Sequence, residues 1–143
     1  MMTTRRSIQI LLDTNFLMVP IRFGVDYQAE IERIIGASFI LVTTPAVVDE
    51  LKQLKKSVKI GELKEINFAL NLAEKITIID EILAPGEKVD DQLIRIAQRE
   101  GCVVATTDSE LRRRLRRAGL PVIFLRQTRH LVIEGLIKST CSN

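Results

Sequence analysis

The sequence has little of what several protein classes depend on. It contains no tryptophan, and aromatic residues make up only 4% of the chain. RNA-binding folds that stack bases on exposed aromatic rings, such as RRM and OB domains, are therefore disfavoured. One histidine and two cysteines without a CxxC pair argue against a zinc site. Cys102 lies in an apolar run and Cys141 lies in a polar tail, so no disulfide framework is expected.

Long apolar runs are also absent. None approaches the roughly 18 residues of a membrane span, and residues 10–12 are too short a run for a signal peptide. We therefore expect a cytoplasmic protein without membrane contact. With 143 residues, of which 46% are hydrophobic and 27% charged, the chain has the size and composition of one folded domain. The expected domain spans residues 1–143, with a short tail from about residue 138.

Apolar segments of strand length alternate with amphipathic segments of helical length. The predicted strands are residues 7–12, 39–43, 76–79, 102–106 and 121–125. The predicted helices are residues 26–35, 44–57, 61–75, 89–100 and 107–117, and residues 131–137 could add a short strand or helix. This alternation, with near-continuous apolar strands, predicts an α/β fold: a Rossmann-like parallel sheet of about five strands with helices on both faces.

Acidic side chains lie close to the ends of the predicted strands. Asp13 comes directly after the first strand, and Asp108 follows the fourth. Asp90 and Asp91 begin the helix that leads into the fourth strand, and Glu50 lies near the start of the helix after the second. Because ligands bind outside the carboxyl ends of parallel strands, we expect these carboxylates to meet at one edge of the sheet.

Helical periodicity separates some of these acids from their neighbours. At about 100° per residue, Glu50 lies on the rim of the apolar face of its helix, whereas Asp49 points away from that face. A glutamate beside a core-facing stripe is unusual unless it meets a partner, so Glu50 is the candidate. Asp90 lies closer than Asp91 to the apolar stripe of its own helix, but Asp90 could instead be the N-cap. Periodicity leaves that choice open.

Several carboxylates at one site need compensating charge. Two like charges about 4 Å apart repel by about 4 kcal/mol at an effective dielectric constant near 20. Hard divalent cations prefer carboxylate and water oxygens, which favours Mg²⁺ or Mn²⁺. Such a site can polarise a phosphoryl oxygen and generate a nucleophilic hydroxide. The acids therefore predict metal-dependent hydrolysis of a phosphodiester.

The basic residues are unevenly distributed. The chain has 21 Lys and Arg against 18 Asp and Glu, a net charge of +3, and five of the basic residues fall between Arg112 and Arg117. Leu111 and Leu115 give this helix one core face, so Arg112, Arg113, Arg116 and Arg117 splay around the rest. Two interpretations of these arginines have equal weight: they form a solvated helix face, or they contact the phosphates of a nucleic acid. Phosphate contacts would raise affinity without reading sequence.

Four segments, in order along the chain, resemble the motifs of the PIN-domain nucleases. They are Ile10-Leu11-Leu12-Asp13-Thr14-Asn15, Val47-Val48-Asp49-Glu50-Leu51, Asp91-Gln92-Leu93-Ile94 with Ala97, and Val104-Ala105-Thr106-Thr107-Asp108. The stretch from Thr106 to Leu125 is most similar to the branch that contains the pre-ribosomal-RNA processing nuclease and its archaeal relatives. One departure is Thr107, where many members carry asparagine.

The resemblance implies a PIN-like fold and assigns catalysis and metal binding to Asp13, Glu50, Asp91 and Asp108. It thus favours Asp91 over Asp90. It also implies that Asn15 and Thr106 orient the acids or a bound water. The implied function is a Mg²⁺- or Mn²⁺-dependent endoribonuclease that cleaves single-stranded or loop RNA, in rRNA processing or as a toxin-type ribonuclease. An antitoxin or a ribosome-assembly factor would be its partner.

The same residues also permit plainer interpretations. Asp13 could cap a strand end, Glu50 could pair with a surface lysine, and the other acids could be N-terminal helix charges. The alternative function is then a non-catalytic RNA-binding or assembly module that keeps the PIN fold. A receiver-type regulator is disfavoured because Thr14 and Asn15 stand where an acidic pair is needed. A homodimer is a further expectation, because the apolar residues Phe16, Leu17, Phe23 and Phe68 exceed what one core needs.

Overall fold

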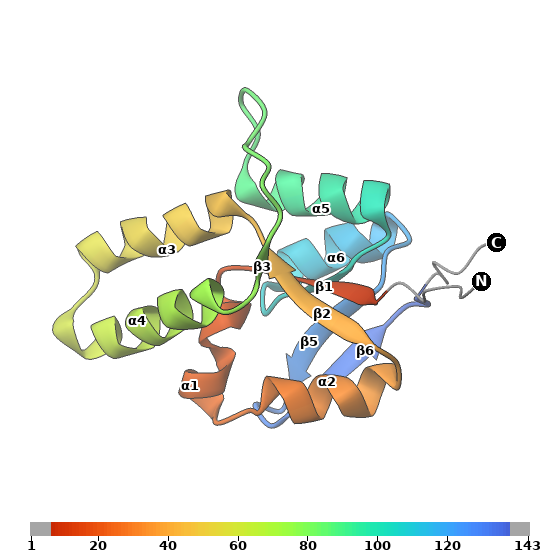
Figure 1. The fold of residues 1–143 in the computed structure, drawn as a ribbon, viewed down its shortest axis with the longest axis horizontal. Coiled ribbons are helices and arrows are strands. Elements are labelled where there is room, and N and C mark those ends of the chain that lie inside the picture. Colours follow the sequence, from red (N-terminus) through yellow and green to blue (C-terminus); the bar gives the residue numbers. More distant parts are fainter. Residues whose placement is uncertain (1–6, 138–143) are drawn as a thin grey trace, which may run out of the picture.

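The central sheet of the computed structural model has six strands in the order β3-β2-β1-β4-β5-β6 (Figure 1). The strands are β1 Ile8–Leu12, β2 Phe39–Thr43, β3 Thr77–Ile78, β4 Val103–Ala105, β5 Val122–Arg126 and β6 His130–Glu134. The first five are parallel, and β6 pairs antiparallel with β5. The predicted α/β parallel sheet is confirmed, and the segment 131–137 contributes an antiparallel strand to its edge.

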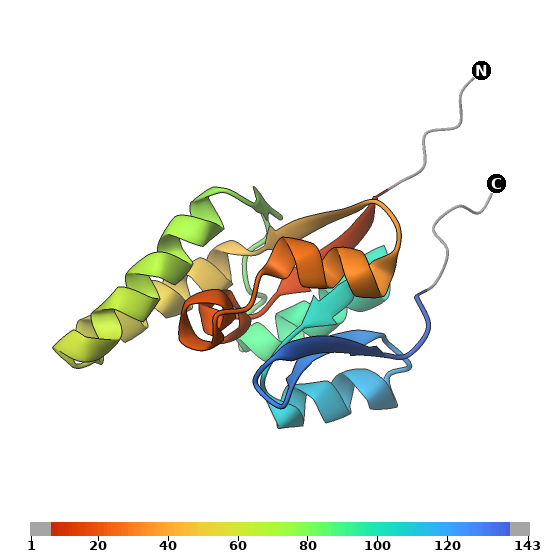
Figure 2. The same ribbon diagram turned by 90° about the horizontal axis from the view of Figure 1, so that it is seen from below.

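Helices connect the parallel strands and cover both faces of the sheet. They are η1 Phe16–Met18, α1 Val19–Phe23, α2 Tyr27–Ile35, α3 Pro45–Ser57, α4 Ile60–Glu74, α5 Val89–Glu100 and α6 Ser109–Arg117. Right-handed crossovers put α2 on one face and α5 and α6 on the other (Figure 2). Helices α3 and α4 pack against each other and project away from the sheet (Figures 1 and 2).

The structure describes residues 7–137. Along these residues, no helix combines the length and the apolarity needed to cross a bilayer. The predicted tail from about residue 138, with Cys141, lies outside the described residues.

Local sequence signals fix where the helices after β1 and β2 begin and end. Thr44 caps α3, because its hydroxyl accepts a hydrogen bond from the Val47 N–H, and Pro45 occupies the first helical position. Gly36 ends α2 in the left-handed conformation. The short pair η1 and α1 was not predicted, since it offers too few residues for a helical period to show.

The carboxyl ends of the central strands are tied to one another. The Asp13 N–H donates to the Ala105 carbonyl at 3.0 Å, which continues the pairing of β1 with β4 by one residue. On the other side of β1, the Thr43 hydroxyl donates to the Leu12 carbonyl at 2.9 Å. These hydrogen bonds fix the positions of the strand ends relative to one another. They therefore also fix where the side chains directly after the strands lie.

The apolar residues suggested as an excess over one core divide into two kinds. Phe16 and Leu17, which belong to η1, are wholly buried in the core. Phe23 and Phe68 are 37% and 36% exposed. Because the fold of a single chain buries Phe16 and Leu17, these two residues do not support a homodimer. The expectation of a homodimer therefore rests on Phe23 and Phe68.

Gly135 gives a first testable prediction about the fold. Its φ is +93°, and a Cβ there would lie 2.2 Å from Arg116 Nη1 and 3.0 Å from the Pro121 Cα. We expect Gly135→Ala to lower the free energy of unfolding by about 2 kcal/mol, since it strains the backbone and displaces an arginine that donates to the Leu120 carbonyl. Gly24→Ala, at φ +66° with open space around it, should cost only about 1 kcal/mol. Equal losses in urea unfolding would contradict the steric part of this explanation.

Candidate active site

Asp13 lies buried at the carboxyl end of β1, with 4% of its surface exposed. One carboxylate oxygen accepts the Thr14 N–H and the other accepts the Thr106 hydroxyl, each at 2.7 Å. Burial is the main cause that raises the pKa of Asp13 to about 6; the two hydrogen bonds oppose it, and the charges of Asp90 and Glu50 add to it. No Lys or Arg within residues 7–137 pairs with this carboxylate.

Glu50, in the second turn of α3, is joined to the end of β1 by a side-chain bond. The buried Thr14 hydroxyl donates to Glu50 Oε1 at 2.5 Å. Asp49 instead lines a separate apolar hollow between α3 and α4. The structure therefore places Glu50, and not Asp49, beside Asp13, as the helical periodicity predicted.

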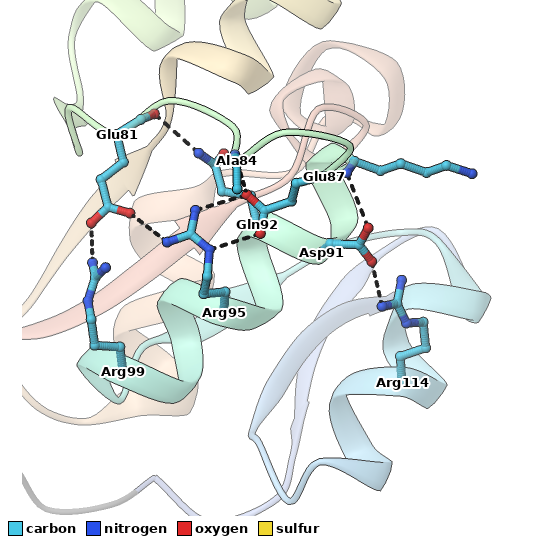
Figure 3. Close-up of polar contacts among 9 residues, drawn as sticks. Glu81, Ala84, Glu87, Asp91, Gln92, Arg95, Arg99 and Arg114 are labelled. Carbon is cyan, nitrogen blue, oxygen red and sulfur yellow. Dashed lines mark hydrogen bonds and ion pairs between the residues drawn. The ribbon is translucent and has the colours of Figure 1, made fainter.

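Asp91, which the family resemblance assigns to metal binding, forms an ion pair with α6. It is the third residue of α5, where Oδ2 accepts the Lys88 N–H at 3.1 Å and Oδ1 accepts from Arg114 Nη2 at 2.7 Å (Figure 3). The Arg114 hydrogen bond, followed by the one from Lys88, lowers the pKa of Asp91. Its charge is already neutralised, and its carboxylate connects the start of α5 to α6.

Asp90 is the acid of this pair that faces the other carboxylates. It is the second residue of α5, and Lys88 rather than Asp90 is the N-cap. Burial raises the pKa of Asp90, and the neighbouring charges of Asp108 and Glu50 raise it too. The resemblance selected Asp91, but the structure brings Asp90 to the acids. We refer to Asp13, Glu50, Asp90 and Asp108 as the acid cluster.

Asp108 is the N-cap of α6. Its Oδ1 accepts the N–H groups of Glu110 and Leu111 at 2.8 and 3.3 Å, while Oδ2 accepts no hydrogen bond from residues 7–137. The helix predicted over residues 107–117 therefore begins at Ser109, because the Asp108 side chain caps it while Thr107 lies in the turn before the cap. Thr106 is buried and connects the two acids, since its hydroxyl donates to Asp13 and accepts the Asp108 N–H at 3.0 Å.

The loop before α5 is held by ion pairs that fix the start of that helix. Arg95 binds both oxygens of Glu87 at 2.8 and 2.9 Å and also binds Glu81 at 3.2 Å. Arg99 pairs with Glu81, and Gln92 donates to the Glu81 carbonyl at 3.2 Å (Figure 3). Single exposed pairs contribute little, whereas a bidentate network has a defined geometry. The network therefore helps to set where α5 presents Asp90.

A pocket of about 170 Å³ opens beside Thr106 and Asp108, and we call it the strand-end pocket. Its walls come from the turn between β1 and η1, from α1, the β4–α6 turn, α6 and β5, and include Asn15, Arg22, Phe23, Arg112 and Phe124. The Asn15 side chain is exposed and makes no hydrogen bond within the described chain. Its predicted role in orienting the acids stays a prediction.

The four arginines expected to hold RNA have unlike surroundings. Arg112 lines the strand-end pocket, whereas Arg113 pairs with Glu110 at 2.7 Å on the solvent side. Arg116 donates to the Leu120 carbonyl at the end of α6, and Arg117 is exposed. Of the four, only Arg112 borders the pocket next to the acids.

The donor set of the acid cluster suits a hard divalent cation, because all of its charged atoms are carboxylate oxygens. Among residues 7–137, however, no three His, Cys, Asp or Glu side chains are close enough to hold one ion between them. Mg²⁺ usually keeps several waters and takes one or two carboxylates together with substrate phosphate oxygens. The cluster fits that mode of binding, and it does not fit a closed cage made of protein ligands.

Comparison with known families identifies the family of the chain. The family described as "PIN like domain" matches residues 10–128, a span that includes the whole acid cluster. The chain belongs to the PIN domain family. The resemblance carried by the four sequence motifs is thereby confirmed, while the family match by itself does not distinguish Asp90 from Asp91.

Among the PIN domain relatives are proteins named for two roles. Ribonuclease VapC4 of Methanocaldococcus jannaschii is 30% identical over 132 residues, which are 90% of this chain and 98% of that protein. Ribonuclease VapC9 of Archaeoglobus fulgidus is 32% identical over 126 residues, 88% and 89% of the two chains. The rRNA-processing protein FCF1 homolog of Mus musculus is 30% identical over 125 residues, 85% of this chain and 59% of that protein.

The solved structure of the PIN domain endonuclease Utp24 has the same fold as this PIN domain. The TM-score is 0.72 at 21% sequence identity, covering 92% of this chain and 95% of that one. This likeness confirms the predicted fold class; at such low identity it says nothing further about the site.

Two features of the site were missed at the level of sequence. The sequence motif contains Thr14 without assigning it a role, yet its hydroxyl joins Glu50 to the end of β1. The predicted basic surface does not include Arg114, yet Arg114 is the ion-pair partner of Asp91. Thr14 had a local signal, because it lies between two polar residues directly after a strand, whereas Arg114 had none.

Proposed function

We propose that this PIN domain is a divalent-metal-dependent endoribonuclease whose active site is the acid cluster Asp13, Glu50, Asp90 and Asp108. The observation that carries the proposal is Asp13, a buried carboxylate without a cationic partner in the described chain and with other carboxylates beside it. A buried acid without a cationic partner lowers the stability of the fold. Binding of a cation at Asp13 would offset this cost and would explain why a carboxylate occupies that position. The relatives named ribonucleases support the same reaction.

The chain's own residues hold and orient the groups that react. Thr106 and the Thr14 N–H fix both oxygens of Asp13, and the Thr14 hydroxyl fixes Glu50. Asp108 keeps Oδ2 free for a ligand while Oδ1 caps α6. When bound, a divalent cation supplies polarisation of the phosphodiester and activation of a water molecule. The fixed carboxylates then determine where that cation and the scissile phosphate lie.

RNA with a pliable backbone is the expected substrate, single-stranded or in a loop, because its phosphate must reach acids at the edge of a sheet. Relatives named VapC ribonucleases and rRNA-processing proteins leave two biological settings, a toxin-type ribonuclease with an antitoxin partner and an rRNA-processing nuclease with assembly partners. We expect either setting to be cytoplasmic, and a homodimer stays part of the proposal through the exposed Phe23 and Phe68.

Cleavage of labelled RNA tests the proposal directly. We expect the purified protein to cut single-stranded RNA with Mn²⁺ or Mg²⁺ and to stop when a chelator is added. Asp13→Asn, purified in the same way, should lose at least about 100-fold in rate, the scale of removing one preorganised group at a reacting centre. Asp49→Asn, at an exposed acid outside the cluster, is the matched control and should cut like the wild type.

Two results would contradict this function. If the wild type and Asp13→Asn cut alike, the activity comes from a contaminant. If both bind RNA and neither cuts it with either metal, the chain is the non-catalytic RNA-binding module.

A further inference from the structure

Arg112 is held in an unusual way at the edge of the strand-end pocket. Its guanidinium carbon lies 4.1 Å from the centre of the Phe124 ring, which is a stacking distance. Phe124 is only 7% exposed, so its ring belongs to the body of the domain. The side chain of Arg112 is 37% exposed, and its Nε lies 3.9 Å from a carboxylate oxygen of Glu134. A rigid aromatic ring thus supports one side of a charged group whose other parts meet the pocket and solvent.

The strand-end pocket has the size for one group of a ligand. Sites that enclose whole small molecules are usually about 300–1,000 Å³, whereas this pocket measures about 170 Å³. Besides Arg112 it is lined by Asn15, Phe23 and Thr106, and by Asp108 of the acid cluster. The ligand group that enters it is therefore immediately beside the acids.

The charges around the pocket disfavour a phosphate as that group. Arg22, the second arginine of the lining, is paired with Glu65 at 2.5 Å. The first N–H groups of α6, which would otherwise attract an anion, already bind the Asp108 carboxylate. That carboxylate also lines the pocket and repels negative charge. A flat and uncharged group that stacks on a guanidinium fits this lining better.

We propose that Arg112, supported by Phe124, is a stacking platform for a single unpaired nucleobase, which enters the strand-end pocket next to the acid cluster. Arginine planes and aromatic rings are the surfaces on which proteins stack splayed bases of single-stranded RNA. The chain lacks exposed tryptophan and tyrosine platforms, and the Phe124–Arg112 pair supplies such a surface with a buried ring. The proposal rests on the proposed function only for the identification of RNA as the ligand.

The proposal gives Arg112 a role that its charge alone cannot fill. The probe is a single-stranded oligoadenylate of eight nucleotides, titrated in a chelating buffer so that nothing is cut. A set of the same oligomers carries one abasic residue, moved along the strand. At one position we expect the abasic change to weaken binding to the wild type by about fivefold or more. Arg112→Lys keeps the charge but has no plane, so this penalty should disappear in that variant.

Arg113→Lys is the matched control, because Arg113 is on the same helix and, among residues 7–137, forms its ion pair with Glu110 on the solvent side. It should keep the wild-type abasic penalty. Phe124→Leu, which removes the supporting ring, should reduce the penalty; its thermal unfolding and that of Arg112→Lys are measured to show that both remain folded. A penalty of equal size in Arg112→Lys and the wild type overturns the proposal. So does a wild type that binds no oligomer or shows no penalty at any position.

The binding assay and the cleavage assay test the two proposals independently, so either proposal can be contradicted while the other stands. If the abasic penalty depends on Arg112 but no metal supports cleavage, the base platform stands and the nuclease proposal fails. If RNA is cut in an Asp13-dependent way but Arg112→Lys binds with the wild-type pattern, the nuclease stands and Arg112 is a phosphate contact only.

Discussion

Replacing Asp13 by asparagine should make the metal-free protein more stable while it abolishes RNA cleavage. In the folded chain the pKa of Asp13 is about 6, against an ordinary value of 3.8, chiefly because the carboxyl is buried. A difference of about two pKa units corresponds to about 3 kcal/mol of stability lost at neutral pH. Asparagine fills the same space without that charge, and its amide can still accept the Thr14 N–H. We expect a gain of about 1–3 kcal/mol.

The pH dependence of this gain has a definite sign. Below about pH 4 the Asp13 carboxyl is neutral in both the folded and the unfolded chain, so the two proteins should differ little. Between pH 4 and 6 the folded chain still holds a proton that the unfolded chain has lost, so the wild type loses stability as the pH rises. The advantage of Asp13→Asn should therefore grow across that window and level off above pH 6.

Urea unfolding at a series of pH values, with a chelator present, measures this difference. Asp49→Asn, at an exposed position, should stay within about 0.5 kcal/mol of the wild type at each pH. Added Mg²⁺ should then stabilise the wild type, because it binds only the folded site, and should have much less effect on Asp13→Asn. If the asparagine variant were less stable than the wild type at pH 7, the charge of Asp13 would have to be stabilised by an interaction that the structure does not contain.

The parts of the fold that could be predicted from the sequence rest on local patterns. The run Ile10-Leu11-Leu12 ends at Asp13, and a buried strand followed by an acid marks both an element and its functional end. Thr44-Pro45 and Gly36 identify helix boundaries because capping depends on adjacent residues. Glu50 could be separated from Asp49 because the apolar residues Val47 and Leu51 define one face of the helix, and the two acids lie at different angles to it.

The parts that could not be predicted depend on distant residues. Asp90 and Asp91 are neighbours on the first turn of α5, and what distinguishes them is Arg114, 23 residues further along the chain. A comparison of short sequence motifs considers only neighbouring residues, so it cannot detect that ion pair. In the same way, β6 forms because β5 offers an open edge, and the apolar run Leu131-Val132-Ile133 is too short for periodicity alone to distinguish a strand from a helix.

Asp90 and Asp91 should respond to substitution in opposite ways, which is the second large effect that we expect. Asp90→Asn removes a carboxylate that faces Asp108 and Glu50, so it should lower the cleavage rate by about 100-fold or more. It should also raise stability slightly, because the pKa of Asp90 is raised by burial and by those neighbouring charges. Asp91→Asn leaves the acid cluster intact, so its cleavage rate should stay within about tenfold of the wild type.

The stability of Asp91→Asn should fall instead. It loses the charge that pairs with Arg114 and part of the cap at Lys88, and about 40% of the Asp91 side chain is exposed, which limits the effect. Because the Arg114 contact lowers the pKa of Asp91, the difference from the wild type should be present at neutral pH and disappear as the solution is made acidic. Arg114→Gln removes the same pair from the other side and should reproduce this loss of stability. If Asp91→Asn proved to be the variant without activity and Asp90→Asn cut RNA normally, the acid that the motif selects would be the functional one, and the Arg114 pair would have to break before catalysis.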